Sequence, residues 1–205
     1  MQFHTDTINR LFGTRCYLCG AMDRAADEGI GWRKAIRDKL NLGIVWLDPT
    51  CKPTNIGAEN SETRAERRRQ KNLGNWEYVA QEMKVIRCVD LRMVDLCDFM
   101  VVYLNMDVHA CGTYEEIALA NRQKKPIFIC CEQGKTKAPD WLFGVIPHDY
   151  IHSTWPEVYG HIQQVAHAED FVDLHRRWYF FDWTGVASDP NSDHRLRYFE
   201  MPKDR

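Results

Sequence analysis

The stretch Phe99-Met100-Val101-Val102-Tyr103-Leu104 is the segment that says most about the fold. Its six residues are apolar or aromatic without interruption, so neither alternating face is polar. Such a run is typical of a central strand in a parallel sheet, because helices cover both faces of that sheet. A second run, Ile127 to Cys131, follows Lys125-Pro126 and predicts another buried strand.

Outward from these strands, helical and strand patterns alternate along the chain. Two further strands are predicted at 14–19 and 44–47. Helices are expected at 29–41, 64–87 (bent near Gly74), 91–97, 113–122 and 155–167. Asp90 is expected at a turn or strand end, where it would cap the helix over 91–97. This alternation predicts an α/β protein with a parallel sheet flanked by helices.

The length suggests one domain with an extension, since domains average roughly 150 residues and the chain has 205. We expect the α/β domain to span 1–168, with an insert or lid at about 48–82. An aromatic-rich C-terminal extension would occupy 169–205. The basic run from Arg64 to Lys71 has two interpretations, a solvated helix face, or a mobile lid or patch that meets a nucleotide phosphate or nucleic acid.

Composition excludes several classes of protein. Lysine and arginine number 27 against 29 acidic residues, a net charge of −2, so we expect no nucleic-acid partner. No apolar run approaches the roughly 18 residues of a membrane span, and the first residues do not resemble a secretory signal. We therefore expect a cytoplasmic protein that does not enter a membrane.

The eight cysteines are expected to be reduced and mostly buried thiols. Cys16 and Cys19 form a C-x-x-C motif, but the chain offers no second ligand pair of the kind that zinc sites use. We expect neither a bound metal nor a cofactor.

The candidate site lies in the loops that follow the strands, because open α/β sheets bind ligands outside the carboxyl ends of their strands. The relevant loops are 20–31, 89–92 and 105–116. Gly112-Thr113 would open a helix whose free N–H groups favour an anion. Glu115 and Glu116 are expected in its first turn, where the helix dipole lowers the pKa of a carboxylate.

An ionised carboxylate in such a cleft can attack an anomeric carbon. A second carboxylate, Asp90, could share the work with Glu116 by taking the acid role. Purely structural roles are also possible for these residues. Glu116 could simply balance the positive end of a helix dipole, Asp90 could cap a helix, and Asp98 could be a capping or turn residue.

Several motifs together resemble the nucleoside 2-deoxyribosyltransferase family, which includes the deoxynucleoside 5′-monophosphate N-glycosidases. In chain order these motifs are Cys16-Tyr17-Leu18-Cys19-Gly20-Ala21-Met22, Asp90 eight residues before Asp98 and the strand after it, Gly112-Thr113-Tyr114-Glu115-Glu116, and Lys125-Pro126 before a strand. The resemblance covers about 14–131, and more loosely extends to about 167.

The resemblance implies a flavodoxin-like, Rossmann-like fold and a double-displacement reaction on a nucleoside or nucleotide. Glu116 would be the nucleophile, Asp90 would handle the proton of the leaving base or orient that base, and the sugar would pass to another base or to water. A homodimer or larger homo-oligomer is also implied. The residues expected to bind substrate are Tyr17, Gly20, Asp98, His109, Gly112 and Thr113.

One position departs from the family pattern. Ala110 stands where transferases of the family carry an aspartate for the sugar 5′-hydroxyl and where the monophosphate hydrolases often carry a serine. His109 or Asp107 could substitute, so nucleoside and 5′-nucleotide both remain open as substrates. Two other functions stay in view: a phosphoribohydrolase like the cytokinin-activating enzymes, which carry glycines where this chain has Ala110-Cys111, and a non-catalytic nucleotide sensor.

Overall fold

The structure, a computed structural model, describes residues 9–22, 24–52, 56–168 and 175–181. Its centre is a five-stranded sheet in the order β2-β1-β3-β4-β5, and every neighbouring pair is parallel. The strands are β1 (Arg15–Gly20), β2 (Val45–Leu47), β3 (Phe99–Leu104), β4 (Ile127–Cys131) and β5 (Ile151–His152). The predicted α/β parallel sheet is confirmed.

The chain order of the strands creates a switch point between β1 and β3. After β1 the chain moves to β2 on one side, and then returns to β3 on the other side. Gly20 at the end of β1 pairs with Tyr103 of β3. In open α/β sheets a crevice at such a point is the usual ligand site, so the topology directs attention to the end of β1.

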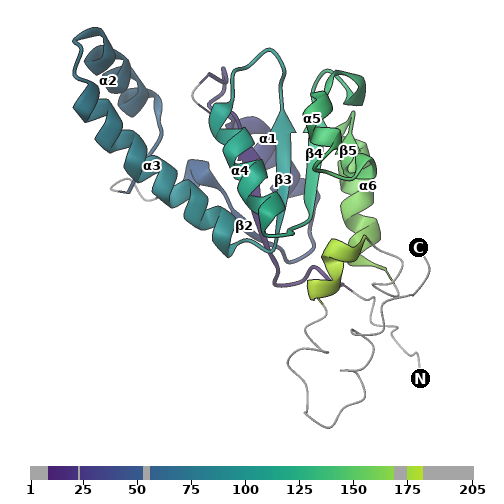
Figure 1. The fold of residues 1–205 in the computed structure, drawn as a ribbon. Coiled ribbons are helices and arrows are strands. Elements are labelled where there is room, and N and C mark those ends of the chain that lie inside the picture. Colours follow the sequence, from purple (N-terminus) through teal and green to yellow (C-terminus); the bar gives the residue numbers. More distant parts are fainter. Residues whose placement is uncertain (1–8, 23, 53–55, 169–174, 182–205) are drawn as a thin grey trace, which may run out of the picture.

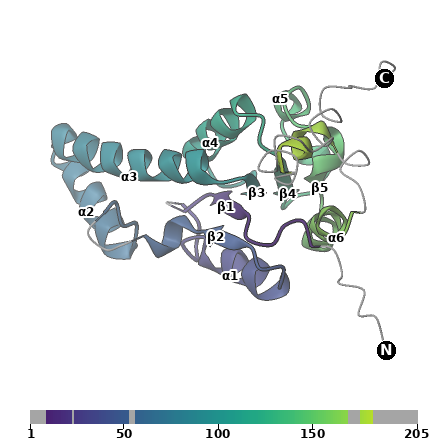
Figure 2. The ribbon, with the colours of Figure 1, turned by 90° about the horizontal axis from the view of Figure 1, so that it is seen from below.

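Helices cover both faces of the sheet. Figure 2 shows α1 (Ile30–Lys39) and α6 (Trp155–Ala166) on one face, with α3 (Trp76–Leu96) and α4 (Cys111–Arg122) on the other. The two remaining α-helices are α2 (Ser61–Asn72) and the short α5 (Asp140–Phe143). Residues 99–102 of β3 are 0% exposed, which confirms that this strand is central and covered on both sides.

The helix α3, which leads from α2 to the strand β3, is longer than the sequence predicted. Gly74, with φ +73°, separates α2 from α3 and so confirms the bend. The helix α3 then runs without a break to Leu96, so the predicted turn at 89–90 and separate helix over 91–97 are wrong. No glycine or proline lies within α3, and Asp90 therefore sits inside a helix instead of capping one.

The range of the predicted insert contains a 3₁₀ turn, η1 (Pro49–Cys51), then α2 and the first third of α3. Figure 1 shows that α2 and the adjoining end of α3 project beyond the sheet. None of the helices in the described ranges has the length and apolar character needed to cross a bilayer.

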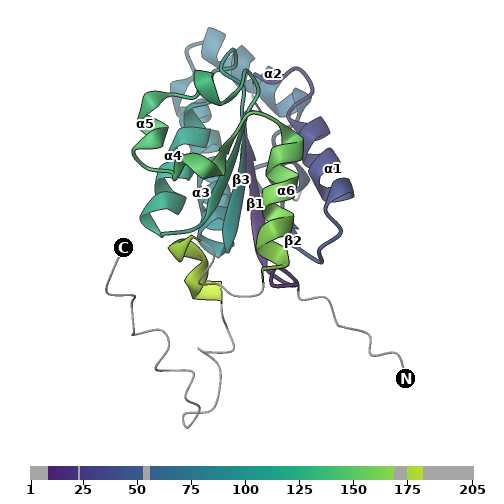
Figure 3. The same ribbon diagram turned by 90° about the vertical axis from the view of Figure 1, so that its right-hand side faces the viewer.

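Two further 3₁₀ turns, η2 (Lys135–Lys137) and η3 (His148–Tyr150), lie between β4 and β5, a two-residue edge strand that was not predicted. Of the C-terminal extension only 175–181 is described. It includes η5 (Arg176–Phe181), which lies beneath the sheet at the amino ends of its strands (Figure 3). Trp178 is fully buried there and donates from Nε1 to the Tyr150 hydroxyl at 2.6 Å. The predicted boundary at 168/169 and the rest of the extension lie outside the described residues.

Candidate active site

Glu116 faces the strand β1 with both of its carboxylate oxygens. The Tyr17 hydroxyl donates to Oε1 at 2.9 Å, and the Cys19 thiol donates to Oε2 at 2.8 Å. Tyr17 and Cys19 are two residues apart on a strand, so their side chains point to the same face of the sheet. The carboxylate is thus held between two neutral donors at the switch point of the sheet.

Burial changes the acidity of Glu116. Desolvation is the main cause that raises its pKa to about 7, and the nearby charge of Asp90 adds to the rise. Hydrogen bonds from Cys19 and Tyr17 act in the opposite direction. The residue as a whole is half-buried, and the ionised form of its carboxylate is disfavoured.

The expected first-turn effect on these glutamates is wrong. The helix α4 begins at Cys111, so its first turn contains no acidic residue and Glu116 lies in the second turn. Glu115 points elsewhere, to an exposed ion pair with Arg87 that lowers its pKa. The two neighbouring glutamates therefore have different surroundings: Glu116 is turned toward β1, and Glu115 is turned toward α3.

Asp90 reaches the same region from α3. Lys52 Nζ donates to Asp90 Oδ1 at 2.9 Å and to Glu59 Oε2 at 3.2 Å. Burial raises the pKa of Asp90, while Lys52 opposes that rise. Since the charge of Asp90 also raises the pKa values of Glu116 and Tyr17, the two carboxylates share one electrostatic environment.

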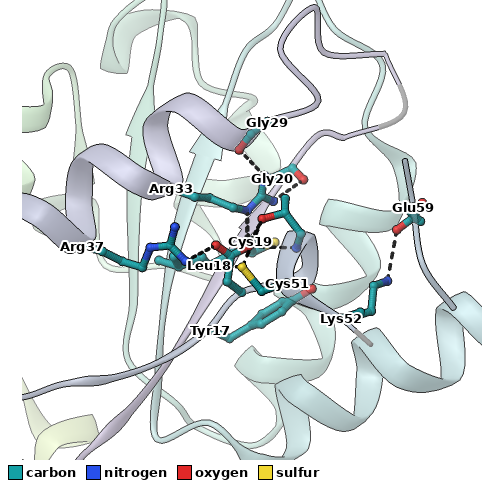
Figure 4. Close-up of polar contacts among 12 residues, drawn as sticks. Tyr17, Leu18, Cys19, Gly20, Gly29, Arg33, Arg37, Cys51, Lys52 and Glu59 are labelled. Carbon is teal, nitrogen blue, oxygen red and sulfur yellow. Dashed lines mark hydrogen bonds and ion pairs between the residues drawn. The ribbon is translucent and has the colours of Figure 1, made fainter. Parts of the chain in front are cut away.

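A buried guanidinium stabilises the end of β1. Arg33 of α1 is 0% exposed and donates to the main-chain oxygens of Leu18 at 3.1 Å, Gly20 at 2.9 Å and Gly29 at 2.7 Å. Figure 4 shows this fan of contacts beside the Lys52–Glu59 pair. Arg33 lies 3.8 Å from Asp48, an opposite charge that compensates its burial.

Gly20 is required by close packing. A Cβ built on it would lie 3.0 Å from the Trp32 ring and 3.0 Å from the Tyr103 carbonyl oxygen. The sequence prediction placed Gly20 at the site, and the structure places it where β1 ends at the switch point.

The amino end of α4 carries the other predicted residues. Gly112 is exposed and its Cβ position faces open space, whereas Thr113 is buried with its carbonyl 3.8 Å from Cys19 Sγ. His109 is exposed beside Ala110, the residue at which α4 begins without a side-chain cap. These residues lie within two turns of Glu116 on the same segment.

Asp98 does not join this group, and its assignment to substrate binding is corrected. It precedes β3 and accepts from the Arg15 main-chain N–H at 2.7 Å and from the Arg15 guanidinium at 2.7 and 3.1 Å. Arg15 opens β1 and Gly20 ends it, so Asp98 lies at the opposite end of the strands from the site. Asp98 instead has a structural role, because it binds Arg15 at the start of β1.

The basic run of α2 divides between two environments. Arg64 is buried and paired with Glu28, and Arg67 is buried 3.7 Å from Glu59. Arg68, Arg69 and Lys71 are exposed. Neither interpretation of the run, a fully solvated face or a free cationic patch, describes it as a whole.

Two contributors, Arg33 and Lys52, were not predicted from the sequence, and Cys19 was placed beside the site without a role. Cys19 had a usable signal, because alternation along the strand places it beside Tyr17. Arg33 and Lys52 had none, since a buried cation is identified only by the tertiary contacts that surround it. In the described part of the chain, no group of three or more His, Cys, Asp or Glu side chains is arranged to hold a metal ion.

No protein-family model matches the sequence, and no curated protein sequence does. Solved structures with a related fold include a 2-desoxiribosyltransferase from Leishmania mexicana, at 18% identity over 59% of this chain and 66% of that one (TM-score 0.40). Another is a 2-deoxyribosyltransferase from Bacillus psychrosaccharolyticus, at 16% identity over 78% and 94% (TM-score 0.48). A CMP N-glycosidase from Clostridium botulinum matches at 16% identity over 73% and 98% (TM-score 0.40). At identities of 16–18% and TM-scores of 0.40 to 0.48, the likeness concerns the fold alone.

Proposed function

We propose that the protein cleaves the N-glycosidic bond of a nucleoside, deoxynucleoside or nucleoside 5′-monophosphate through a glycosyl-enzyme intermediate on Glu116. The sugar then passes to another base or to water. The observation that carries the proposal is the Glu116 carboxylate itself, on a half-buried residue, held at both oxygens and facing the end of β1 with Asp90 nearby.

A carboxylate held in this way suits attack on an anomeric carbon. One Glu116 oxygen forms a bond to C1′ while the bond from C1′ to the base nitrogen breaks and its electron pair leaves with the base. The negative charge of the carboxylate stabilises the oxocarbenium-like transition state before it traps the sugar. Two donors restrict rotation of the carboxylate, which lowers the entropic part of the barrier.

Asp90 is the proposed proton donor to the leaving base. Burial raises its pKa, so its carboxyl group retains a proton more readily than an ordinary aspartate. The ammonium of Lys52 is bound to the same group at 2.9 Å, and this fixed positive charge stabilises the carboxylate that Asp90 becomes once its proton has passed to the base. In the second half of the reaction Asp90 accepts a proton from the incoming base or water.

The form of the substrate depends on the start of α4. Ala110 has no polar side chain for a 5′-hydroxyl or a 5′-phosphate, but the uncapped N–H groups of α4 and the exposed His109 lie beside it. Main-chain N–H groups at a helix start are donors that suit phosphate oxygens. We therefore include 5′-monophosphates among the proposed substrates.

The experiment is incubation with a panel of nucleosides and 5′-monophosphates, each with and without an acceptor base. Chromatography follows free base and exchanged nucleoside, which separates hydrolysis from transfer. Intact-protein mass spectrometry after rapid quenching should show an added sugar that is absent from Glu116→Ala. Unchanged base release by folded Glu116→Ala would refute the proposal. Tight binding without turnover across the panel would favour a sensor. Light scattering tests the homo-oligomer, which remains part of the proposal.

A further inference from the structure

Cys19 is a fully buried thiol whose contacts have no role in the mechanism so far. Its Sγ lies 2.8 Å from Glu116 Oε2 and 3.8 Å from the Thr113 main-chain oxygen. Desolvation, followed by the nearby Glu116 carboxylate, raises the pKa of the thiol well above its ordinary value. The group therefore remains a protonated, neutral donor at physiological pH, and a thiolate nucleophile is excluded at this position.

We infer that Cys19 is a positioning residue for the nucleophile. Its thiol holds Glu116 Oε2 through a weak hydrogen bond and leaves Oε2, not Oε1, as the oxygen that attacks the anomeric carbon. The inference rests on the proposed function, because it assigns a role within that reaction.

The two donors to Glu116 differ in strength. A thiol is a weaker hydrogen-bond donor than a phenolic hydroxyl, so the Tyr17 hydroxyl withdraws more electron density from Oε1 than Cys19 withdraws from Oε2. Both donors orient the carboxylate, but Oε2 keeps the more available lone pair. Attack through Oε2 therefore combines orientation with nucleophilicity.

The two donors also differ in what they can do once the ester has formed. When Oε2 bonds to C1′ it becomes a poorer acceptor, and the thiol can turn to the Thr113 oxygen that already lies 3.8 Å away. For the Tyr17 hydroxyl, the described residues provide Glu116 Oε1 as its one hydrogen-bond acceptor. Oε1 becomes the carbonyl oxygen of the ester and can keep that bond. The thiol proton stays on sulfur throughout, and the leaving base takes its proton from Asp90.

Among the described residues, the titratable or charged groups that act most strongly on Glu116 are Tyr17 and Cys19 from β1, Asp90 from α3 and Arg33 from α1. A change at Cys19 alters the donor to Oε2 and leaves the other three in place. Its effect on the ionisation of Glu116 can therefore be isolated.

The test compares Cys19→Ala and Cys19→Ser with Cys16→Ala as the matched control. Cys16 is equally buried on the same strand but lies on the other face, where its thiol contacts main-chain groups, the Tyr17 oxygen at 3.8 Å and Val101, and not the Glu116 carboxylate. The readouts are the pH profile of kcat/KM and the carbon-13 NMR titration of the Glu116 carboxyl group. Thermal unfolding verifies that each variant is folded.

Opposite shifts are expected from the two Cys19 variants. Loss of the donor in Cys19→Ala should raise the midpoint of both titrations by about half a pH unit or more and lower kcat about three- to tenfold. The stronger hydroxyl donor of Cys19→Ser should lower the midpoint and also lower kcat, since Oε2 becomes less nucleophilic. Cys16→Ala should change neither quantity.

If Cys19→Ala has the same kcat and the same titration midpoints as the wild type, the inference is overturned. The proposed function is tested separately, by Glu116→Ala. If Cys19→Ala does not fold, the near-isosteric Cys19→Ser decides, and an unshifted midpoint in that variant overturns the inference. If the wild type turns over no substrate, the proposed function is overturned. The contact between Cys19 and Glu116 then has no catalytic role, even if the NMR titration detects the hydrogen bond.

Discussion

Tyr17 and Glu116 are 99 residues apart in the sequence, yet the Tyr17 hydroxyl donates to Glu116 Oε1 at 2.9 Å. Tyr17 is 1% exposed, so its hydroxyl is fixed by the packing of β1 and cannot move to follow the carboxylate. The strand therefore determines where α4 presents Glu116.

Tyr17→Phe should reduce kcat/KM at pH 7 by about tenfold or more, because a hydrogen bond to an ionised group contributes about 1.5–3 kcal/mol. The loss should be smaller at pH 8, where more of Glu116 ionises despite its higher pKa. Steady-state kinetics at both pH values would measure this. Tyr150→Phe is the control, since it removes another buried hydroxyl that accepts from Trp178. An equal loss in both variants would mean a general effect on the fold.

The activity of the wild type should fall as the pH drops below about 7, the pKa of Glu116. Attack requires the ionised carboxylate, so each further pH unit should cost about tenfold in kcat/KM. The measurement is kcat/KM between pH 5 and pH 9 on the best substrate of the panel. An acid limb near pH 4.5 would show that Glu116 behaves as a solvated glutamate, contrary to its burial.

Glu116→Gln should abolish turnover and stabilise the fold in alkaline solution. The folded-state pKa of Glu116, about 7, lies above its ordinary value of 4.5, so the folded protein binds an extra proton between these values. The contribution of Glu116 to stability is then fully present below pH 4.5 and is lost as the pH rises through 7. Urea unfolding should show a difference below about 1 kcal/mol at pH 5 and a gain of about 3 kcal/mol for the variant at pH 8. A difference that does not depend on pH would contradict this.

Much of the fold could be predicted from local pattern. The uninterrupted apolar run at 99–104 correctly predicted a covered strand, and Gly112 to Glu116 correctly indicated the start of a helix after it. The errors arose where tertiary contacts override local signals. Asp90 resembled a cap, but a buried lysine from a distant loop binds its carboxylate, and a helix continues through it.

The same distinction holds within the candidate site. Tyr17 and Glu116 were predicted by motif resemblance, and the structure brings them together. Lys52 and Arg33 were not predicted, because long cationic side chains are usually solvated and only the surrounding carboxylates and carbonyls reveal a buried one. Asp98 follows the family spacing, yet its place at the start of β3 puts it at the wrong end of the sheet.

Lys52→Met should destabilise the protein by about 3 kcal/mol or more, because removing one partner of a buried ion pair leaves uncompensated charge. Lys52 is buried, with its side chain 3% exposed, between Asp90 and Glu59. The double variant Lys52→Met/Asp90→Asn should recover part of the loss. Denaturant unfolding measures both variants.

The control for Lys52 is Lys34→Met, which removes the cation of an exposed i,i+4 pair with Asp38. A surface pair of this kind contributes at most about 0.5 kcal/mol. An equally small effect of Lys52→Met would mean that Asp90 and Glu59 are neutral in the folded protein.

Gly20→Ala and Gly112→Ala should separate packing from ligand approach. The added methyl at Gly20 meets Trp32 and the Tyr103 carbonyl oxygen at 3.0 Å, so unfolding free energy should fall by about 1–3 kcal/mol. At Gly112 the methyl meets nothing within 4 Å, and alanine in a helix should be neutral or stabilising by about 0.5–1 kcal/mol. If Gly112 lines the substrate site, Gly112→Ala should nevertheless raise KM. An unchanged KM together with unchanged stability would remove Gly112 from the site and place the substrate nearer to β1.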